Sequence, residues 1–440
     1  MNRTFACRRP LTATLAAVGL SLSGTAVTAD AAPSSLVKAG EPMRAVAART
    51  EATFDSGLSI PAPAGPAGTV LATVPLDHRV GLADAAEQHR FAYTTSDQHG
   101  QPATSTGTVF LPHGHAPEGG WSVLAWAHGT VGLGDECAPS INAPSARDAE
   151  YLNHWLNQGY AIVASDYAGL GSPGFHSYLN GKVAAANVVD SVQAAHSLPL
   201  GAELSTAWAV IGQSQGGGVA LHVAHRASAL SHELGLDYRG AVATGAPAYI
   251  EEIVLAAGPS FPPVPLPAGM TTYGLYILAA VEEAHPEIDL NSALTDEGRF
   301  MIDEAKKSCY DEVAAAAVGT SLSRAFTKPL RDVPGLADAT RAFMSTPVAG
   351  YDKPVFLGHG IQDIDVPSPI GVVLNSDMWL RQFSPDAAAR NARVEVHWYP
   401  TDHSGTVNLS TRDSTPFLRG IFSDSTGDEA SSSGLPQAML

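Results

Sequence analysis

Short apolar runs alternate with longer amphipathic or Ala-rich stretches along most of the chain. In the N-terminal part, the pattern predicts strands at residues 70–74, 90–95 and 106–111, with a hairpin turn at Asp97-Gln98-His99-Gly100. The apolar run at residues 121–127 predicts a strand that is buried on both faces.

Strands and helices alternate from residue 148 onwards. Helical segments are predicted at residues 148–158 and 182–197, and strands at 161–165, 207–211 and 238–244. This spacing is typical of βαβ units, so it predicts an α/β fold with a mostly parallel sheet flanked by helices.

The alternation stops after Ala248 and resumes a hundred residues later. Residues 249–349 contain helical, Ala-rich pieces and a Pro-rich stretch at 259–267, which predicts a helical lid or cap inserted into the core. The pattern then predicts strands at residues 354–358 and 394–398, a helix at 372–382 and a final amphipathic piece at 415–422.

These patterns divide the chain into a core and peripheral segments. The core is expected at residues 61–248 and 350–422, on either side of the lid at 249–349. Residues 32–60 are rich in Ala, Pro, Ser and Gly and predict a flexible N-terminal lead, and residues 423–440 predict a disordered tail.

The N-terminus has the features of a secretory signal peptide. Three arginines precede an apolar segment at residues 11–27 and the small-residue run Ala29-Asp30-Ala31, so cleavage is expected after residue 31. The Arg8-Arg9 pair leaves the twin-arginine route open beside the general one. No later segment reaches 18 uncharged apolar residues, which predicts an exported protein without stable membrane insertion.

The charge excludes some classes of partner. The formal net charge is −18, and loss of three Arg and one Asp with residues 1–31 makes it −20. Such an acidic protein is not expected to bind nucleic acid or to dock electrostatically on anionic lipid.

Two cysteines remain once Cys7 leaves with the signal peptide, namely Cys137 and Cys309. Paired cysteines in an exported protein usually form a disulfide, so this bridge is predicted.

The apolar run at residues 207–211 leads into Gly212-Gln213-Ser214-Gln215-Gly216, a Gly-x-Ser-x-Gly sequence. In α/β-hydrolases this pattern forms the nucleophile elbow, a strained strand-to-helix turn that exposes the serine. Ser214 is therefore the predicted nucleophile, and the NH of Gln215 is a predicted oxyanion donor.

A serine nucleophile needs a base and an acid that orients it, and in this fold the chain order is Ser, acid, His. Asp363 is the favoured acid because of its spacing to the following Val-Pro pair, with Asp365 as the alternative. His403 lies just beyond a predicted strand, where α/β active sites form, and is favoured as the base over His397, which lies within the strand.

The segment His128-Gly129-Thr130 follows an early core strand and is expected to supply the second oxyanion donor. The NH of Thr130 is favoured, with Gly129 as the alternative, and His128 is expected to be structural. The predicted chemistry requires no metal and no cofactor.

Several stretches together resemble one family. They are Pro66 to Leu71, Tyr93 to Asp97, Gly107 to Pro112, Cys137-Ala138-Pro139-Ser140, Gly159 to Val163, Ser165-Asp166-Tyr167-Ala168-Gly169, the elbow, and the Asp363 and His403 loops. They are similar to the secretory lipase family of α/β-hydrolases, the yeast lipase A group and its actinobacterial relatives. The resemblance implies hydrolysis of triacylglycerols or simple esters, a helical lid over an acyl tunnel, no metal, and a bridge from Cys137 to Cys309 in the lid.

The sequence thus predicts a secreted serine hydrolase that cleaves small-molecule or lipid carboxylic esters through an acyl-enzyme. An acyltransferase using the same Ser214, Asp363 and His403 is the alternative among enzymes. A non-catalytic secreted binding protein on a hydrolase scaffold is the alternative from another class. Acyl-chain length, alcohol preference and oligomeric state are left open.

Overall fold

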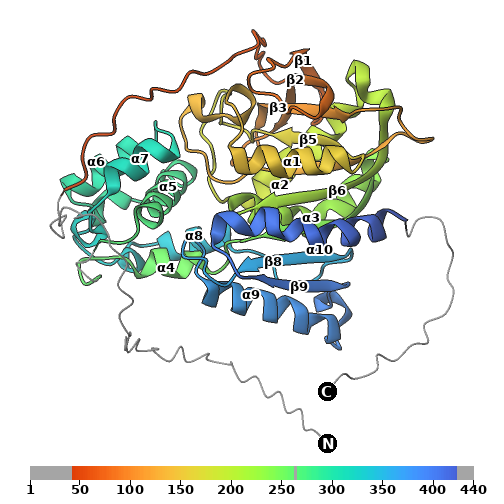
Figure 1. Cartoon of the computed structure of the whole chain (residues 1–440). Coiled ribbons are helices and arrows are strands. Elements are labelled where there is room, and N and C mark those ends of the chain that lie inside the picture. The colour runs from red at the N-terminus through yellow and green to blue at the C-terminus, as the bar shows by residue number, and fades with distance from the viewer. Residues whose placement is uncertain (1–41, 262–264, 424–440) are drawn as a thin grey trace, which may run out of the picture. The chain divides into compact units, whose positions relative to one another are not determined.

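A nine-stranded sheet forms the centre of the protein (Figure 1). The computed structural model describes residues 42–261 and 265–423, which belong to one compact unit. The strand order is β1-β2-β3-β5-β4-β6-β7-β8-β9. The pairs from β1 to β5 are antiparallel and those from β5 to β9 are parallel, so the predicted α/β fold with a mostly parallel sheet is confirmed. The strands are β1 (Val70–Pro75), β2 (Ala85–Ser96), β3 (Pro102–Pro112), β4 (Trp121–Ala127), β5 (Ala161–Ser165), β6 (Leu204–Gln213), β7 (Asp237–Thr244), β8 (Val355–Gly360) and β9 (Val394–Tyr399).

Helices cover both faces of the sheet. One face packs against α2 (Gly181–His196), α3 (Gln215–Leu234) and α9 (Ser368–Leu380). The other packs against α1 (Ala146–Asn157) and α10 (His403–Ser423).

The strand pleat explains why both faces are apolar. Along β4, Val123 and Ala125 belong to the core on the α2 and α3 side, and Leu124 and Trp126 belong to the core on the α1 side. Alternate side chains of a strand point to opposite faces, so a strand covered on both sides reads as a continuous apolar run.

Helix α10 begins much earlier than the predicted amphipathic piece at 415–422. It starts at His403, and its first three turns bury Thr406, Ser410 and Ser414 with a single apolar side chain, Val407. The Thr406 hydroxyl donates to the Asp402 carbonyl at 2.7 Å and the Ser410 hydroxyl to the Val407 carbonyl at 2.6 Å. Nearby backbone carbonyls satisfy the Thr406 and Ser410 hydroxyls, whereas Ser414 Oγ has no hydrogen-bond partner among the described residues. Buried hydroxyl side chains give this part of the sequence no apolar period.

The insertion between β7 and β8 is helical. Its helices are α4 (Ile250–Ala256), α5 (Ala268–Ala284), α6 (Asp296–Ala305), α7 (Tyr310–Ala317) and α8 (Leu336–Met344). The described residues between 249 and 349 contribute no strand to the sheet. Helix α5 lies in the middle of the lid's own apolar core, which explains why Leu275 to Val281 are all buried.

The N-terminal segment 42–60 forms no helix or strand and runs from the lid to the core (Figure 1). Met43 is buried in the lid core, the NH of Arg44 donates to Ala316, and the NH of Val46 donates to Glu304 at 2.9 Å. The predicted signal peptide, the start of the predicted lead and the tail from residue 424 lie outside the described residues. Among the helices that are described, none has the length and apolarity needed to cross a membrane.

His222 of α3 makes the stability of this fold depend on pH. Burial, and then the positive charges of Lys182, His225 and Arg226, lower the pKa of His222 to about 3. In the unfolded chain this ring takes up a proton below its ordinary pKa of 6.5, whereas in the folded chain it does not. The free energy of unfolding is therefore highest above pH 6.5 and decreases as the pH falls below this value.

We expect His222→Gln to weaken this dependence. Between pH 6 and pH 4, the free energy of unfolding should fall less steeply in the variant, by about 1.4 kcal/mol per pH unit. Urea denaturation at a series of pH values measures the slope. Equal slopes in the two proteins would contradict the prediction.

Candidate active site

Ser214 occupies a strained turn between β6 and α3. Its backbone lies at φ 59° and ψ −124°, and its NH donates to the Thr244 carbonyl at 2.9 Å. A Cβ at Gly212 would lie 2.0 Å from the Gly216 carbonyl, and one at Gly216 would lie 1.8 Å from the Ala127 carbonyl. Only glycine fits at these two positions, as the elbow pattern predicts.

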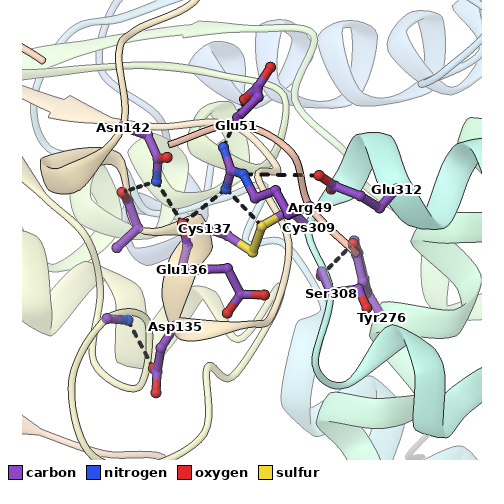
Figure 2. Close-up of a disulfide and its surroundings, with 12 residues drawn as sticks. Arg49, Glu51, Asp135, Glu136, Cys137, Asn142, Tyr276, Ser308, Cys309 and Glu312 are labelled. Atoms are coloured by element: carbon purple, nitrogen blue, oxygen red, sulfur yellow. Dashed lines mark hydrogen bonds and ion pairs between the residues drawn. A yellow bond between two sulfur atoms is a disulfide. The ribbon is translucent and has the colours of Figure 1, made fainter. Parts of the chain in front are cut away.

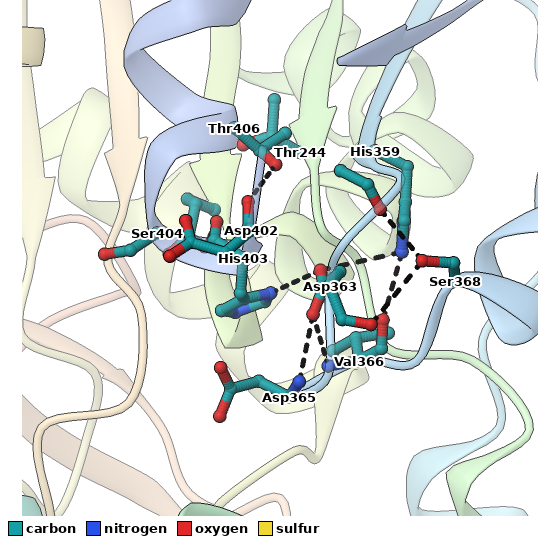
Figure 3. A network of polar contacts seen from close by, with 12 residues as sticks. Thr244, His359, Asp363, Asp365, Val366, Ser368, Asp402, His403, Ser404 and Thr406 are labelled. Atoms are coloured by element: carbon teal, nitrogen blue, oxygen red, sulfur yellow. Dashed lines mark hydrogen bonds and ion pairs between the residues drawn. The ribbon is translucent and has the colours of Figure 1, made fainter. Parts of the chain in front are cut away.

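Asp363 lies in the loop between β8 and α9 and is held by three donors (Figure 3). Its Oδ1 accepts the backbone NH groups of Asp365 and Val366, at 3.0 and 2.9 Å. Its Oδ2 accepts Nδ1 of His403 at 2.7 Å. The carboxylate is buried, so these bonds fix one orientation of it toward the His403 ring.

His403 is the first residue of α10 and is 6% exposed. Because Nδ1 donates to Asp363, Nε2 is the basic nitrogen of the neutral ring. Nε2 is buried and has no hydrogen-bond partner among the residues that the structure describes. A buried, unpartnered basic nitrogen of this kind is free to accept a proton from a neighbouring hydroxyl.

Two contacts place His403 beside the elbow. The side-chain amide of Gln213, the residue before Ser214, donates to the His403 carbonyl at 3.2 Å. The ring also lies against Gly245, the residue that follows Thr244. The structure therefore brings Ser214, Asp363 and His403 to one edge of the sheet, where the parallel strands end.

The side chains of the two predicted alternatives make other contacts. The carboxylate of Asp365 accepts the Tyr273 hydroxyl of the lid at 3.3 Å. The ring of His397 stacks on Phe356 at 4.5 Å and faces Asp413 of α10.

His359 is a second histidine behind the acid, and sequence reasoning assigned it no role. Its Nε2 donates to the Val366 carbonyl at 3.0 Å and lies 3.6 Å from Asp363 Oδ2 (Figure 3). Burial lowers the pKa of His359, although the Asp363 carboxylate opposes this shift. A neutral His359 supports the acid loop without neutralising the Asp363 charge.

The predicted oxyanion residues lie around the elbow. Gln215 is the first residue of α3, so its NH has no carbonyl one turn earlier in the helix to donate to. A Cβ on Gly129 would lie 3.6 Å from the Ser214 Cβ, which places the segment from His128 to Thr130 against the nucleophile. The Thr130 hydroxyl bonds to the Tyr178 hydroxyl at 2.7 Å.

A further buried histidine, His176, contacts the start of α3. No motif in the sequence marked it as part of the site. The amide side chain of Gln215 donates to His176 Nε2 at 3.0 Å. Burial, followed by the nearby His128, lowers the pKa of His176 to about 3, so the ring is neutral and accepts this bond. The Tyr167 ring lies between the two histidines, 4.3 Å from His128 and 5.7 Å from His176. His128 is part of this buried stack, in agreement with its predicted structural role.

A cavity of about 90 Å³ opens beside Ser214 and Gln215. Its other walls come from the lid, from the acid loop and from Tyr178, Leu179 and Pro247 of the core. Most are apolar, including Ile250, Ile253, Phe261, Met270, Ile277 and Phe326. Asp365 is the only charged residue among the described residues that line it. Such a cavity suits an apolar group attached to an ester carbonyl at the serine.

The predicted disulfide between Cys137 and Cys309 is present and joins the core to the lid (Figure 2). The adjoining backbone pairs as well, because the NH of Leu133 donates to Ser308 and the NH of Tyr310 donates to Val131. Arg49 Nη1 donates to Cys309 Sγ at 3.0 Å and to the Glu136 carbonyl at 2.9 Å. The lid, the loop that follows the predicted oxyanion segment, and the N-terminal segment therefore meet at this bridge.

Among the described residues, the one group with metal-ligand spacing is Glu136 with Cys137 and Cys309. Both of these cysteines are in the disulfide, so neither offers the thiolate that a metal would need.

The secretory lipase family model matches residues 145–339, which contain the elbow and most of the lid. The resemblance to secretory lipases is confirmed.

Solved structures show the same fold. Candida antarctica lipase A matches with a TM-score of 0.65 and 17% identity, over 83% of this chain and 84% of that one. The rice cell wall degrading esterase LipA from Xanthomonas oryzae matches with a TM-score of 0.63 and 18% identity, over 81% of this chain and 98% of that one. No curated protein sequence matches the chain.

These findings confirm the α/β-hydrolase fold. The match to the secretory lipase model, together with the lipase and esterase of the same fold, supports a carboxylic-ester hydrolase of the lipase/esterase class. The family and the disulfide are both consistent with secretion.

A substitution at Gly245 tests whether catalysis depends on the position of the His403 ring. Gly245 has φ +55°, and a Cβ there would lie 2.9 Å from His403 Cε1. We expect Gly245→Ala to displace the ring and to lower kcat/KM for a soluble ester by about 100-fold. Gly235→Ala is the matched control, since Gly235 has φ +69° but no atom within 4 Å of the added Cβ. Equal activity losses in the two variants would mean that backbone strain, and not the His403 contact, is responsible.

The disulfide should stabilise the enzyme by restricting the unfolded chain. Its loop spans 172 residues. For a loop of this length, removing the bridge with Cys137→Ser and Cys309→Ser should lower the free energy of unfolding by up to about 5 kcal/mol. Denaturant unfolding with and without reductant measures this effect. Reductant should destabilise the native protein and leave the double variant unchanged.

Proposed function

We propose that the protein is a secreted serine esterase or lipase that works through an acyl-enzyme, with Ser214, Asp363 and His403 as its triad. The proposal rests on the different surroundings of the two His403 ring nitrogens. Nδ1 bonds to the buried Asp363 carboxylate at 2.7 Å, while Nε2 is buried without a partner among the described residues.

In the first half of the proposed reaction, His403 Nε2 takes the proton of the Ser214 hydroxyl while Oγ attacks the ester carbonyl carbon. Asp363 keeps the ring in the required tautomer and stabilises the imidazolium. The negative charge that develops on the carbonyl oxygen is stabilised by the NH groups of Gln215 and Thr130. The imidazolium then gives its proton to the departing alcohol, which leaves an acyl group on Ser214.

In the second half, water enters the position that the alcohol has left. His403 takes a proton from this water, the hydroxide attacks the acyl carbon, and the proton returns to Ser214 Oγ as the acid is released. The acyl chain occupies the apolar cavity between Ser214 and the lid, which favours acids with an apolar chain.

Paired carboxylate variants test the assignment of the acid. Asp363→Asn would hold His403 in the wrong tautomer and should lower kcat by about 10⁴-fold, as Ser214→Ala should to at least the same extent. Asp365→Asn keeps the backbone NH that Asp363 accepts and an oxygen that can accept the Tyr273 hydroxyl. It removes only a charge, so its effect should stay within about 10-fold. Hydrolysis of p-nitrophenyl esters of increasing acyl length gives these rates.

If Asp365→Asn were the more damaging substitution, the acid would be misassigned. Covalent labelling of Ser214 by a fluorophosphonate separates an enzyme from a non-catalytic binding protein. Product analysis with an added alcohol separates hydrolysis from acyl transfer, because a transferase would form a new ester in place of the free acid.

A further inference from the structure

The outward face of α9 is apolar. Val372, Val373, Trp379 and Leu380 are 50%, 53%, 45% and 60% exposed, and Phe383, which follows the helix, is 68% exposed. These five residues are called the α9 face below. Their spacing of three, four and seven residues places them in one stripe along the helix.

The opposite side of α9 is also partly apolar, since Leu374 and Met378 pack into the core under the sheet. A helix on a protein surface normally turns polar residues outwards, so an apolar outer stripe indicates a binding surface. The rings of Trp379 and Phe383 lie 5.2 Å apart, which makes the far end of the stripe a broad aromatic patch. Beside it, Asp377 and Arg381 pair at 3.0 Å and neutralise one another.

Exposed apolar residues also lie in the loop that joins α9 to the active-site edge. Ile361 and Ile364 are 55% and 62% exposed and lie in the loop before α9, which also contains Asp363. The end of that loop, from Asp365 to Pro367, lines the cavity together with Ser214. Ile253 of α4 also lines the cavity and is 40% exposed. Figure 1 shows α9 at the margin of the molecule, where no other described helix covers it.

The net charge of the chain favours an uncharged partner for the α9 face. The chain has a formal net charge of −18, so two copies, or the chain and an anionic lipid surface, repel one another. An uncharged apolar surface meets no such repulsion and gains from covering the exposed side chains.

We propose that the α9 face docks the enzyme on the surface of an aggregated, uncharged ester lipid, such as an emulsion droplet. Docking there would bring the cavity mouth, with Ile253 and Ile364, to the surface from which an ester molecule enters. This inference rests on the proposed ester-hydrolase function and adds the physical state of its substrate.

The test combines two substrates with two sets of variants. The face variant carries Val373→Ser, Leu380→Ser and Phe383→Ser. The control variant carries Phe300→Ser, Val318→Ser and Leu409→Ser, at apolar residues that are 38%, 49% and 41% exposed on α6, after α7 and on α10. Each protein is assayed on emulsified tributyrin and on p-nitrophenyl butyrate in solution, and its melting temperature is recorded.

We expect the face variant to lose at least about 10-fold in activity on the emulsion, because the loss of three apolar contacts weakens partition to the droplet. Its activity on the dissolved ester should change less than about 2-fold, since none of the three residues lines the cavity. The control variant should match the native protein on both substrates. Equal losses on both substrates, or an equal loss in the control variant, would overturn the proposal.

Flotation with triolein droplets coated with phosphatidylcholine tests docking without catalysis. The Ser214→Ala protein should float with the droplets, and the same protein with the three face substitutions should not. If the native protein hydrolyses no ester but Ser214→Ala still floats through this face, the proposed function fails while the docking surface stands. A native dimer that the face substitutions dissociate, with flotation unchanged, would overturn the proposal and show that a second copy covers α9.

Discussion

The close approach of strand β6, helix α3 and the end of β4 at Ser214 is the constraint on which the rest of the site depends. Gly216 must be free of a side chain because its Cβ would fall 1.8 Å from the Ala127 carbonyl. That contact forces the turn to be tight and places Ser214 at φ 59°, where its NH reaches the neighbouring strand at Thr244. The strain is tolerated because the parallel sheet on both sides holds the turn in place.

The same contact brings the segment after β4 against the nucleophile, and the disulfide extends this arrangement into the lid. Cys309 is bridged to Cys137, and its neighbours Ser308 and Tyr310 accept from and donate to the backbone of Leu133 and Val131. The base of α7 is thereby fixed to the loop that follows the predicted oxyanion segment. The cavity wall formed by the lid thus has a fixed position at one end.

Two exceptions to the usual pattern of apolar core and polar surface stand out: buried histidines beside the site and exposed apolar residues on α9. Buried histidines, His176 and His359, stay neutral and accept or donate single hydrogen bonds that hold Gln215 and the acid loop. At the surface, α9 exposes apolar side chains that nothing in its own chain covers among the described residues. The first arrangement orients groups toward the serine, and the second provides a surface on which an apolar aggregate can lie.

The sequence by itself determined the α/β fold, the lid insertion, the elbow and the cysteine pair, because each leaves a local mark: apolar runs, a break in alternation, Gly-x-Ser-x-Gly, or two remaining thiols. Only the tertiary structure decided that Asp363, and not Asp365, contacts His403. Both carboxylates lie in one loop two residues apart, and their directions depend on which backbone NH groups the folded loop turns inwards.

The sequence also did not predict that α10 starts at His403, nor did it predict the contacts of His176 and His359. The first turns of α10 bury mainly hydroxyl side chains, two of which donate to nearby backbone carbonyls, so they carry no apolar period. The partners of the two histidines come from other loops that meet them only when the strands align at one edge of the sheet. Periodicity reports the burial of each segment, but contacts between segments are fixed by the packing of the whole sheet.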